Sequence, residues 1–237
     1  MLKAAIEKIL EIAPFHTEEI DGQTYSDRQL IRVPPRVDQP KEITVNSLDG
    51  IAQLIQAEGI HASNRIFLHI VNPVGIRAFS TYGDYFTRAF LYRADYDGPT
   101  FQEGFREQQK AIIELRSRFI SNEGSEYLLN LLSRITKEST ISSMDNGVTQ
   151  AVEAKQGIAL AAKVAVKPRV LLRPYRTFLE VEQPESEFLL RLNEDGNVGL
   201  FEADGGAWKQ AAKANIKAYF NQALAEEIGA GKVVVLM

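Results

Sequence analysis

The first apolar residues of the chain lie at helical spacing. They recur every three or four positions as Leu2, Ala5, Ile6, Ile9, Leu10 and Ala13. Pro14 follows and ends the run, so the pattern predicts an amphipathic helix over residues 2–13. A second helical pattern begins after Ser47, a favourable N-cap residue, and closes at Gly59. We therefore expect two helices in the first quarter of the chain.

Strand patterns dominate the rest of the first half. Residues 15–45 are polar and contain three prolines. Because proline cannot donate to a strand ladder, we expect one or two short edge strands over 23–33 and then an extended connector. Three strand-like runs follow, at 65–71, 75–82 and 86–96. They are close neighbours separated by turn residues such as Asn72-Pro73, which predicts an antiparallel meander.

The second half mixes helices and strands in clusters. Helical patterns cover 100–120, 124–135 and 207–227, and strand patterns cover 148–158, 164–172, 188–192, 198–201 and 233–236. The turn sequence from Asn193 to Asn197 gives the clearest hairpin signal. Because strands and helices do not alternate strictly, we predict an α+β fold, mainly antiparallel sheet with three or more packed helices. We expect residues 1–237 to form one unit, with a possible subdivision near 136–145.

Composition narrows the possible functions. The chain has 237 residues, no cysteine, three histidines and a formal net charge of −4. It lacks a disulfide framework, a cysteine nucleophile, paired histidine ligands, a Gly-x-Ser-x-Gly elbow and a phosphate-binding loop. It also lacks a secretory signal and an apolar run long enough to cross a bilayer. We expect a cytoplasmic protein that uses no cofactor or metal and binds no membrane.

The segment from Leu172 to Pro184 concentrates charged and aromatic residues. It contains Arg173, Tyr175, Arg176, Glu180 and Glu182. On a strand, the two glutamates would share a face and could hold a metal, and the arginines could clamp a phosphate. The alternative is an edge strand whose charges compensate one another.

The Asp204 to Trp208 run is a second candidate. A strand ends, two glycines allow a tight turn, and a helix begins. The free N–H groups of a helix start attract anions, but Asp204 would repel a phosphate there. Asp204 could instead cap the helix, with the glycines supplying unusual backbone angles.

Two further patterns leave other functions open. Asp145, Glu153 and Lys155 follow the acid, acid-x-Lys order of many metal-dependent nucleases, although Asp145-Asn146-Gly147 also reads as a turn. Residues 163–176 are basic, with aromatic Tyr175 and Phe178 at or beyond the end, as in a single-stranded nucleic-acid platform. Alternatively, these cations pair with glutamates of the fold or of another subunit.

Several stretches together resemble a family of uncharacterised proteins encoded by tailed phages and prophages. The similar stretches are Leu172–Pro184, Phe201–Trp208, Asp145–Gln150, Lys155–Ile158, Val45–Gly50 and Leu115–Phe119. The resemblance covers most of the chain and carries no assigned activity or catalytic residue. It implies a protein of the infected cell's cytoplasm that is concerned with phage DNA or with host functions.

From these patterns we expect a non-enzymatic, homo-oligomeric binding protein with no catalytic residue. Its target would be a host factor such as a defence protein, a nucleotide ligand, or a component of phage DNA transactions. The candidate binding residues are Arg173, Tyr175, Arg176, Glu180, Glu182, Asp204 and Trp208. A Mg²⁺-dependent nuclease built on Asp145, Glu153 and Lys155, or a protein that binds single-stranded nucleic acid, are the alternatives.

Overall fold

The computed structural model of the chain describes most of its residues. The described ranges are 2–12, 17–21, 23–26, 40–58, 65–83, 86–134, 140–145, 150–156, 159–193 and 195–237. The chain forms two compact units, Met1–Asp38 and Gln39–Met237. The α+β class predicted from the sequence is confirmed, with helices and mainly antiparallel sheets in separate stretches of the chain.

The first unit holds one helix and one hairpin. Helix α1 (Leu2–Ile12) matches the predicted helix and ends just before the residues around Pro14, which are outside the described part. Strands β1 (Thr17–Ile20) and β2 (Gln23–Ser26) pair antiparallel. The predicted edge strand is therefore found over its first four residues, and the rest of 23–33 lies outside the described residues.

A five-stranded sheet with the order β15-β4-β5-β6-β3 forms the first part of the second unit. Its strands are β3 (Ile43–Val45), β4 (Ile66–Asn72), β5 (Gly75–Ser80), β6 (Phe90–Asp95) and β15 (Val233–Leu236). The antiparallel pairing of β4, β5 and β6 confirms the predicted meander. The two edge strands run parallel to their neighbours, β3 to β6 and β15 to β4.

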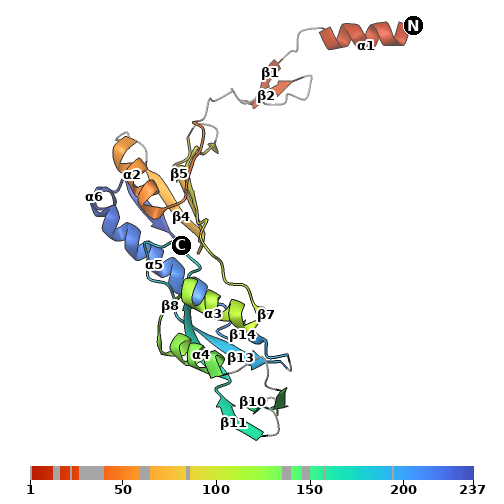
Figure 1. The fold of residues 1–237 in the computed structure, drawn as a ribbon. Helices are drawn as coiled ribbons and strands as arrows, with labels where there is room; N and C mark the ends of the chain where they lie inside the picture. Colours follow the sequence, from red (N-terminus) through yellow and green to blue (C-terminus); the bar gives the residue numbers. More distant parts are fainter. Residues whose placement is uncertain are drawn as a thin grey trace. The chain divides into compact units, whose positions relative to one another are not determined.

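Helices cover one face of this sheet (Figure 1). They are α2 (Leu48–Glu58), α5 (Ala207–Ala223) and α6 (Ala225–Gly229). Alternate strand residues such as Ile66, Leu68 and Ile70 point into this core, where Ile51 and Phe220 of the helices meet them. Ser47 caps α2 as predicted, since its Oγ accepts a hydrogen bond from the Gly50 N–H at 3.0 Å.

A second sheet, with the order β7-β14-β13-β12-β8, has its own core. Its strands are β7 (Gly104–Arg106), β8 (Phe119–Ile120), β12 (Arg169–Pro174), β13 (Ser186–Leu192) and β14 (Val198–Glu202). The β13–β14 pairing confirms the predicted hairpin. Helices α3 (Gln108–Ser117) and α4 (Glu123–Arg134) contribute Leu115 and Leu128 to this core.

The predicted helix over 100–120 is wrong at both ends. Only Gln108–Ser117 is helical, with β7 before it and β8 after it. Gly104 has a φ of +131°, a conformation outside the helical region. The apolar residues that suggested a longer helix are used by the sheet instead, since Phe101 packs against Phe119 and Phe188 with ring centroids 6.0 and 5.0 Å apart.

Three more strands form a separate antiparallel sheet in the order β11-β10-β9. They are β9 (Thr140–Asp145), β10 (Gln150–Gln156) and β11 (Ala159–Val166). The predicted strand over 164–172 is split in two, β11 and β12, because Pro168 lies in the bend between them. Residues 135–139, within the predicted subdivision near 136–145, lie outside the described residues.

Candidate functional site

The segment 172–184 lies between the two cores of the second unit, and we call it the junction segment. Phe178 and Val181 enter the core of the first sheet, whereas Leu172 belongs to the core of the second. The Thr177 hydroxyl donates to the Pro73 carbonyl oxygen at 2.5 Å. The junction segment therefore tethers the second sheet to the β4–β5 turn of the first.

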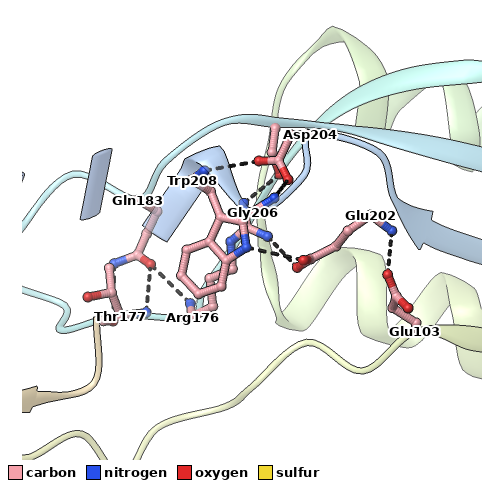
Figure 2. Close-up of polar contacts among 9 residues, drawn as sticks. Glu103, Arg176, Thr177, Gln183, Glu202, Asp204, Gly206 and Trp208 are labelled. Atoms are coloured by element: carbon pink, nitrogen blue, oxygen red, sulfur yellow. Dashed lines mark hydrogen bonds and ion pairs between the residues drawn. The ribbon is translucent and has the colours of Figure 1, made fainter. Parts of the chain in front are cut away.

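Gln183 holds the turn of the junction segment. Its buried side-chain oxygen accepts hydrogen bonds from the N–H groups of Arg176 and Thr177 at 3.0 and 3.3 Å (Figure 2). Its amide nitrogen donates to the Phe178 carbonyl oxygen at 2.9 Å. One amide thus satisfies several backbone groups that would otherwise be buried without partners.

Arg176 is the most buried of the predicted binding residues. Its guanidinium lies 4.0 Å from the Trp208 ring and donates to Glu202 Oε1 at 2.7 Å and to Ser186 Oγ at 2.5 Å (Figure 2). Burial lowers the pKa of Arg176, and the carboxylates of Glu202 and Asp204 act in the opposite direction. Nε of Arg176 is buried and has no hydrogen-bond partner in the described part of the chain. The side chain is enclosed by the protein, and no open site surrounds it.

Asp204 caps helix α5, as one of the two sequence interpretations proposed. Its two carboxylate oxygens accept hydrogen bonds from the N–H groups of Gly206 at 2.9 Å and Trp208 at 3.1 Å. Both glycines before the helix have positive φ, +62° at Gly205 and +81° at Gly206, which the tight turn requires. The Trp208 indole N–H donates to Glu202 Oε2 at 3.2 Å, so this helix start is fastened to β14.

The other candidates in the junction segment also have partners within the chain. Arg173 pairs with Glu182 at 2.5 Å. Glu180 accepts the Leu48 N–H at 2.7 Å and so caps helix α2 from another part of the sequence. Tyr175 donates its backbone N–H to the Arg118 carbonyl oxygen at 2.9 Å. Ligand binding by these residues stays a prediction, while the charges of Arg173, Glu180 and Glu182 have partners within the chain.

The candidate nuclease residues fall on β9 and β10. Asp145 pairs in register with Gln150, and Glu153 pairs with Ser142. The position opposite Asp145 is therefore three residues from Glu153 along β10. Among the described residues, no group of three or more acidic or histidine side chains is arranged to hold a metal ion.

The face of the first sheet opposite helices α2, α5 and α6 carries, among the described residues, an arrangement that the sequence interpretation did not identify. Rings of Phe67, Phe79 and Phe90 run across β4, β5 and β6, with neighbouring centroids 5.7 and 6.2 Å apart. The Arg88 guanidinium lies over Tyr82 at 3.9 Å, over Phe79 at 4.9 Å and over Phe67 at 5.3 Å. We call these residues, together with His69, Arg77, Phe86 and Arg93 described below, the open face.

Two arginines lie beside the aromatic stripe. Arg77 on β5 is directly opposite Arg93 on β6, and on its other side it is opposite His69 on β4. Like charges directly opposite one another are unfavourable in a sheet. Arg93 is compensated by Asp95 at 2.6 Å, which raises the pKa of Arg93. Arg77 and Arg88 have no carboxylate partner in the described part of the chain, and Arg77 lies 5.7 Å from the Phe90 ring.

A β-bulge places Phe90 on the open face. Ala78 pairs with Tyr92, but the next residue, Phe79, pairs with Phe90, so Leu91 is an extra residue in β6. Leu91 packs against the core and Phe90 is 46% exposed. Without the extra residue, strand alternation would direct Phe90 to the same side as buried Tyr92.

The loop after β5 adds two exposed rings. Tyr82 and Phe86 meet edge to face at 6.3 Å and are 61% and 85% exposed. Phe86 has a φ of +57°, an unusual conformation for a bulky residue. Strand alternation was the sequence signal available for the sheet residues of the open face, since Phe67 and Phe79 alternate with buried neighbours.

A hollow of about 460 Å³ lies between the start of α4 and the edge of β12. Three of its four charged side chains are engaged within the chain. Arg169 pairs with Glu187 at 2.7 Å, Glu185 accepts from the Asn122 amide at 2.9 Å, and the Lys167 ammonium lies 4.9 Å from the Tyr127 ring. The hollow offers a ligand less unpaired charge than the open face does.

The sequence and structure were compared with known proteins. No protein-family model, curated protein or solved structure matches it. Among the described residues, no helix is both long enough and apolar enough to span a membrane.

Proposed function

We propose that this chain is a non-enzymatic binding protein whose open face binds single-stranded nucleic acid. The observation that carries the proposal is the position of Arg88 over Tyr82, Phe79 and Phe67, on a face that the helices leave uncovered. Proteins that bind single strands combine cations for the phosphates with aromatic rings for the bases. Both chemistries occur here within one surface.

The exposed rings supply the stacking positions. Phe90, Tyr82 and Phe86 are all at least 46% exposed. Tyr82 lies under the Arg88 guanidinium, Phe86 packs against Tyr82, and Phe90 packs against Phe79. Bases of any sequence can stack on such rings, each with a gain of about 1–3 kcal/mol. The half-buried Phe67 and Phe79 rings beneath Arg88 hold this guanidinium on the open face.

Arg77 and Arg88 supply the phosphate contacts. Neither has a carboxylate partner among the described residues, so neither gives up an ion pair of the described part of the chain when it binds a phosphate. A phosphate near Arg77 would also relieve its unfavourable cross-strand position opposite Arg93. The net charge of −4 provides no general attraction to nucleic acid, so binding depends on these local cations.

The resemblance to phage and prophage proteins agrees with this proposal. Single strands are intermediates of the phage DNA transactions that the resemblance implies. On this proposal the protein acts in the host cytoplasm and engages nucleic acid without cleaving it. In this proposal Arg77 and Arg88 contact the phosphates in place of Arg173 and Arg176, because the latter two are paired with Glu182 and Glu202.

The direct test is fluorescence anisotropy with short labelled oligo(dT) and oligo(U) at about 50 mM salt. The double variant Arg77→Gln/Arg88→Gln should weaken binding at least about tenfold, and the slope of log K against log salt should fall by about 1–2. Its matched control is Lys110→Gln/Arg116→Gln, which removes the same charge from exposed positions of α3. The control should bind like the wild type.

Two outcomes would overturn the proposal. One is that the wild-type protein binds neither oligonucleotide at low salt. The other is an equal loss in the control double variant, which would show that only overall charge matters. Release of labelled fragments from the oligonucleotides in Mg²⁺ would instead support the nuclease alternative.

A further inference from the structure

Phe86, in the loop between β5 and β6, has a backbone conformation that bulky residues rarely adopt. Its φ is +57°, in the left-handed region where a side chain is strained against its own backbone. Among the described residues other than glycine, the one other positive φ is +54°, at Asp21. Aspartate tolerates this region because its short polar side chain can hydrogen-bond locally. Asp21 is therefore ordinary for its position, whereas Phe86 is strained.

Hydrogen bonds at the base of the loop hold this conformation. The Ser80 N–H donates to the Ala89 carbonyl oxygen at 2.9 Å, and the Ser80 hydroxyl oxygen accepts the Ala89 N–H at 3.0 Å. Closer to Phe86, the Gly83 N–H donates to the Thr87 carbonyl oxygen at 2.9 Å. A strained residue persists only where the surrounding structure fixes it, and these contacts close the loop around Phe86.

The described part of the chain makes little use of the ring that this strain presents. The Phe86 side chain belongs to neither of the hydrophobic cores found among the described residues. It is 85% exposed, and it meets Tyr82 edge to face at 6.3 Å. Strained residues cluster at sites where a side chain is held in position for a ligand. The position of Phe86 beside the Arg88 and Tyr82 stack is such a site.

We infer that the Phe86 ring enters between two consecutive bases of the bound strand, and that the open face therefore selects flexible, pyrimidine-rich single strands. This inference rests on the proposed function of the open face. A ring that is 85% exposed offers both of its faces to bases. Phe90 projects instead from β6 and packs against Phe79, so it offers a place for one base.

The selectivity follows from the cost of separating two bases. Stacking a free base on a ring is tolerant of sequence, but a ring can enter between consecutive bases only after these have unstacked. Adenines in a single strand stack strongly on one another, whereas thymines stack weakly. A duplex resists the insertion further because its bases are paired as well as stacked. The expected order of affinity is oligo(dT), then oligo(dA), then duplex.

Fluorescence anisotropy of the full chain with short labelled oligo(dT) and oligo(dA), at about 50 mM salt, tests the inference. The wild type should bind oligo(dT) about threefold to tenfold more tightly than oligo(dA). Phe86→Ala should bind oligo(dT) more weakly and lose the preference. The matched control is Phe90→Ala, which also removes one ring of the open face. It should weaken binding to both oligonucleotides and keep the preference.

Thermal unfolding tests the role of the strain. Phe86→Gly removes the same ring as Phe86→Ala, but glycine adopts a positive φ without strain. Phe86→Gly should therefore unfold about 2–4 °C above Phe86→Ala, and the two variants should bind alike. Equal unfolding midpoints would overturn the assignment of strain to Phe86.

The outcomes separate this inference from the proposed function. If the wild type binds oligo(dT) and oligo(dA) equally, or if Phe86→Ala keeps the preference, the inference is wrong and the proposed function stands. If the wild type binds neither oligonucleotide, both are wrong. A loss of the preference in Phe90→Ala as well would show that it comes from the open face as a whole, and would overturn the specific role of Phe86.

Discussion

The junction segment and the open face both place an arginine on an aromatic ring, at almost the same distance. Arg176 lies 4.0 Å from the Trp208 ring, and Arg88 lies 3.9 Å from the Tyr82 ring. The difference is in the second partner. Arg176 is 3% exposed and paired with Glu202, whereas Arg88 has no carboxylate partner among the described residues. The comparison is the reason why we propose a binding role for Arg88 and a structural role for Arg176, although both are stacked on a ring.

The largest expected effect tests the structural role of the junction segment. Arg176→Met should lower the free energy of unfolding by about 3 kcal/mol, because Glu202 loses its partner in a largely enclosed site. Urea unfolding followed by circular dichroism measures the change. Arg176→Met/Glu202→Gln should recover part of the loss. A loss below about 1 kcal/mol in the single variant would mean that the ion pair does not hold the two cores together.

The next effect tests the open face alone. Phe90→Ala should weaken binding of oligo(dT) about tenfold by removing one stacking position. The midpoint of thermal unfolding should change little, because the ring is 46% exposed. Phe90→Tyr keeps a ring of the same kind and should bind as the wild type does. If Phe90→Ala reduced stability and left the affinity unchanged, the open face would be structural and the comparison would fail.

A smaller effect concerns the carboxylate that caps α2. Glu180→Gln should cost about 1 kcal/mol in urea unfolding, because a charged acceptor at the N-terminus of the helix is replaced by a neutral one. Oligonucleotide affinity should remain unchanged. Glu182→Gln is a suitable comparison, since its side chain is 74% exposed and its pair with Arg173 should contribute little.

The smallest expected effect is a pH dependence of the stability that comes from Tyr92, on the core side of the first sheet. The Tyr92 hydroxyl donates to Glu58, and burial together with this carboxylate raises the pKa of Tyr92. The neutral hydroxyl is favoured in the folded state, so its contribution to stability is present at neutral pH and declines as the pH rises above about 10, where an unfolded tyrosine ionises. Urea unfolding between about pH 8 and pH 11 should therefore show a steeper loss for the wild type than for Tyr92→Phe. Equal slopes would contradict this assignment.

The sequence predicted those parts of the fold that are decided locally. Ser47, the break at Asn72-Pro73 and the turn at Asn193–Asn197 each determine an element through their immediate neighbours, and each element was found. The helix expected over 100–120 failed because Phe101 has the helical spacing but packs on the second sheet. Periodicity does not distinguish a helix face from side chains that a neighbouring sheet draws in.

The candidate site could be predicted only in part. Arg173, Arg176 and Glu180 drew attention because they are close in sequence, yet their charges are engaged locally by Glu182 and at a distance by Glu202 and the start of α2. Which residues lie on the open face depends on how β4, β5 and β6 pair in register, and this pairing cannot be derived from the sequence alone. Phe90 reaches it through a one-residue bulge, and Arg88 reaches it by folding back from a loop.

The order in which the first sheet is completed follows from its last strand. β15 pairs with β4 from Ile66 to His69, although about two thirds of the chain lies between the two strands. During synthesis on the ribosome, β4 emerges long before β15. The edge of β4 that later pairs with β15 therefore stays unpaired while the residues of the second sheet are synthesised. Pairings between strands so distant in sequence form slowly. The meander should therefore be the part of the nascent chain most exposed to mispairing, and the natural place for a chaperone to act.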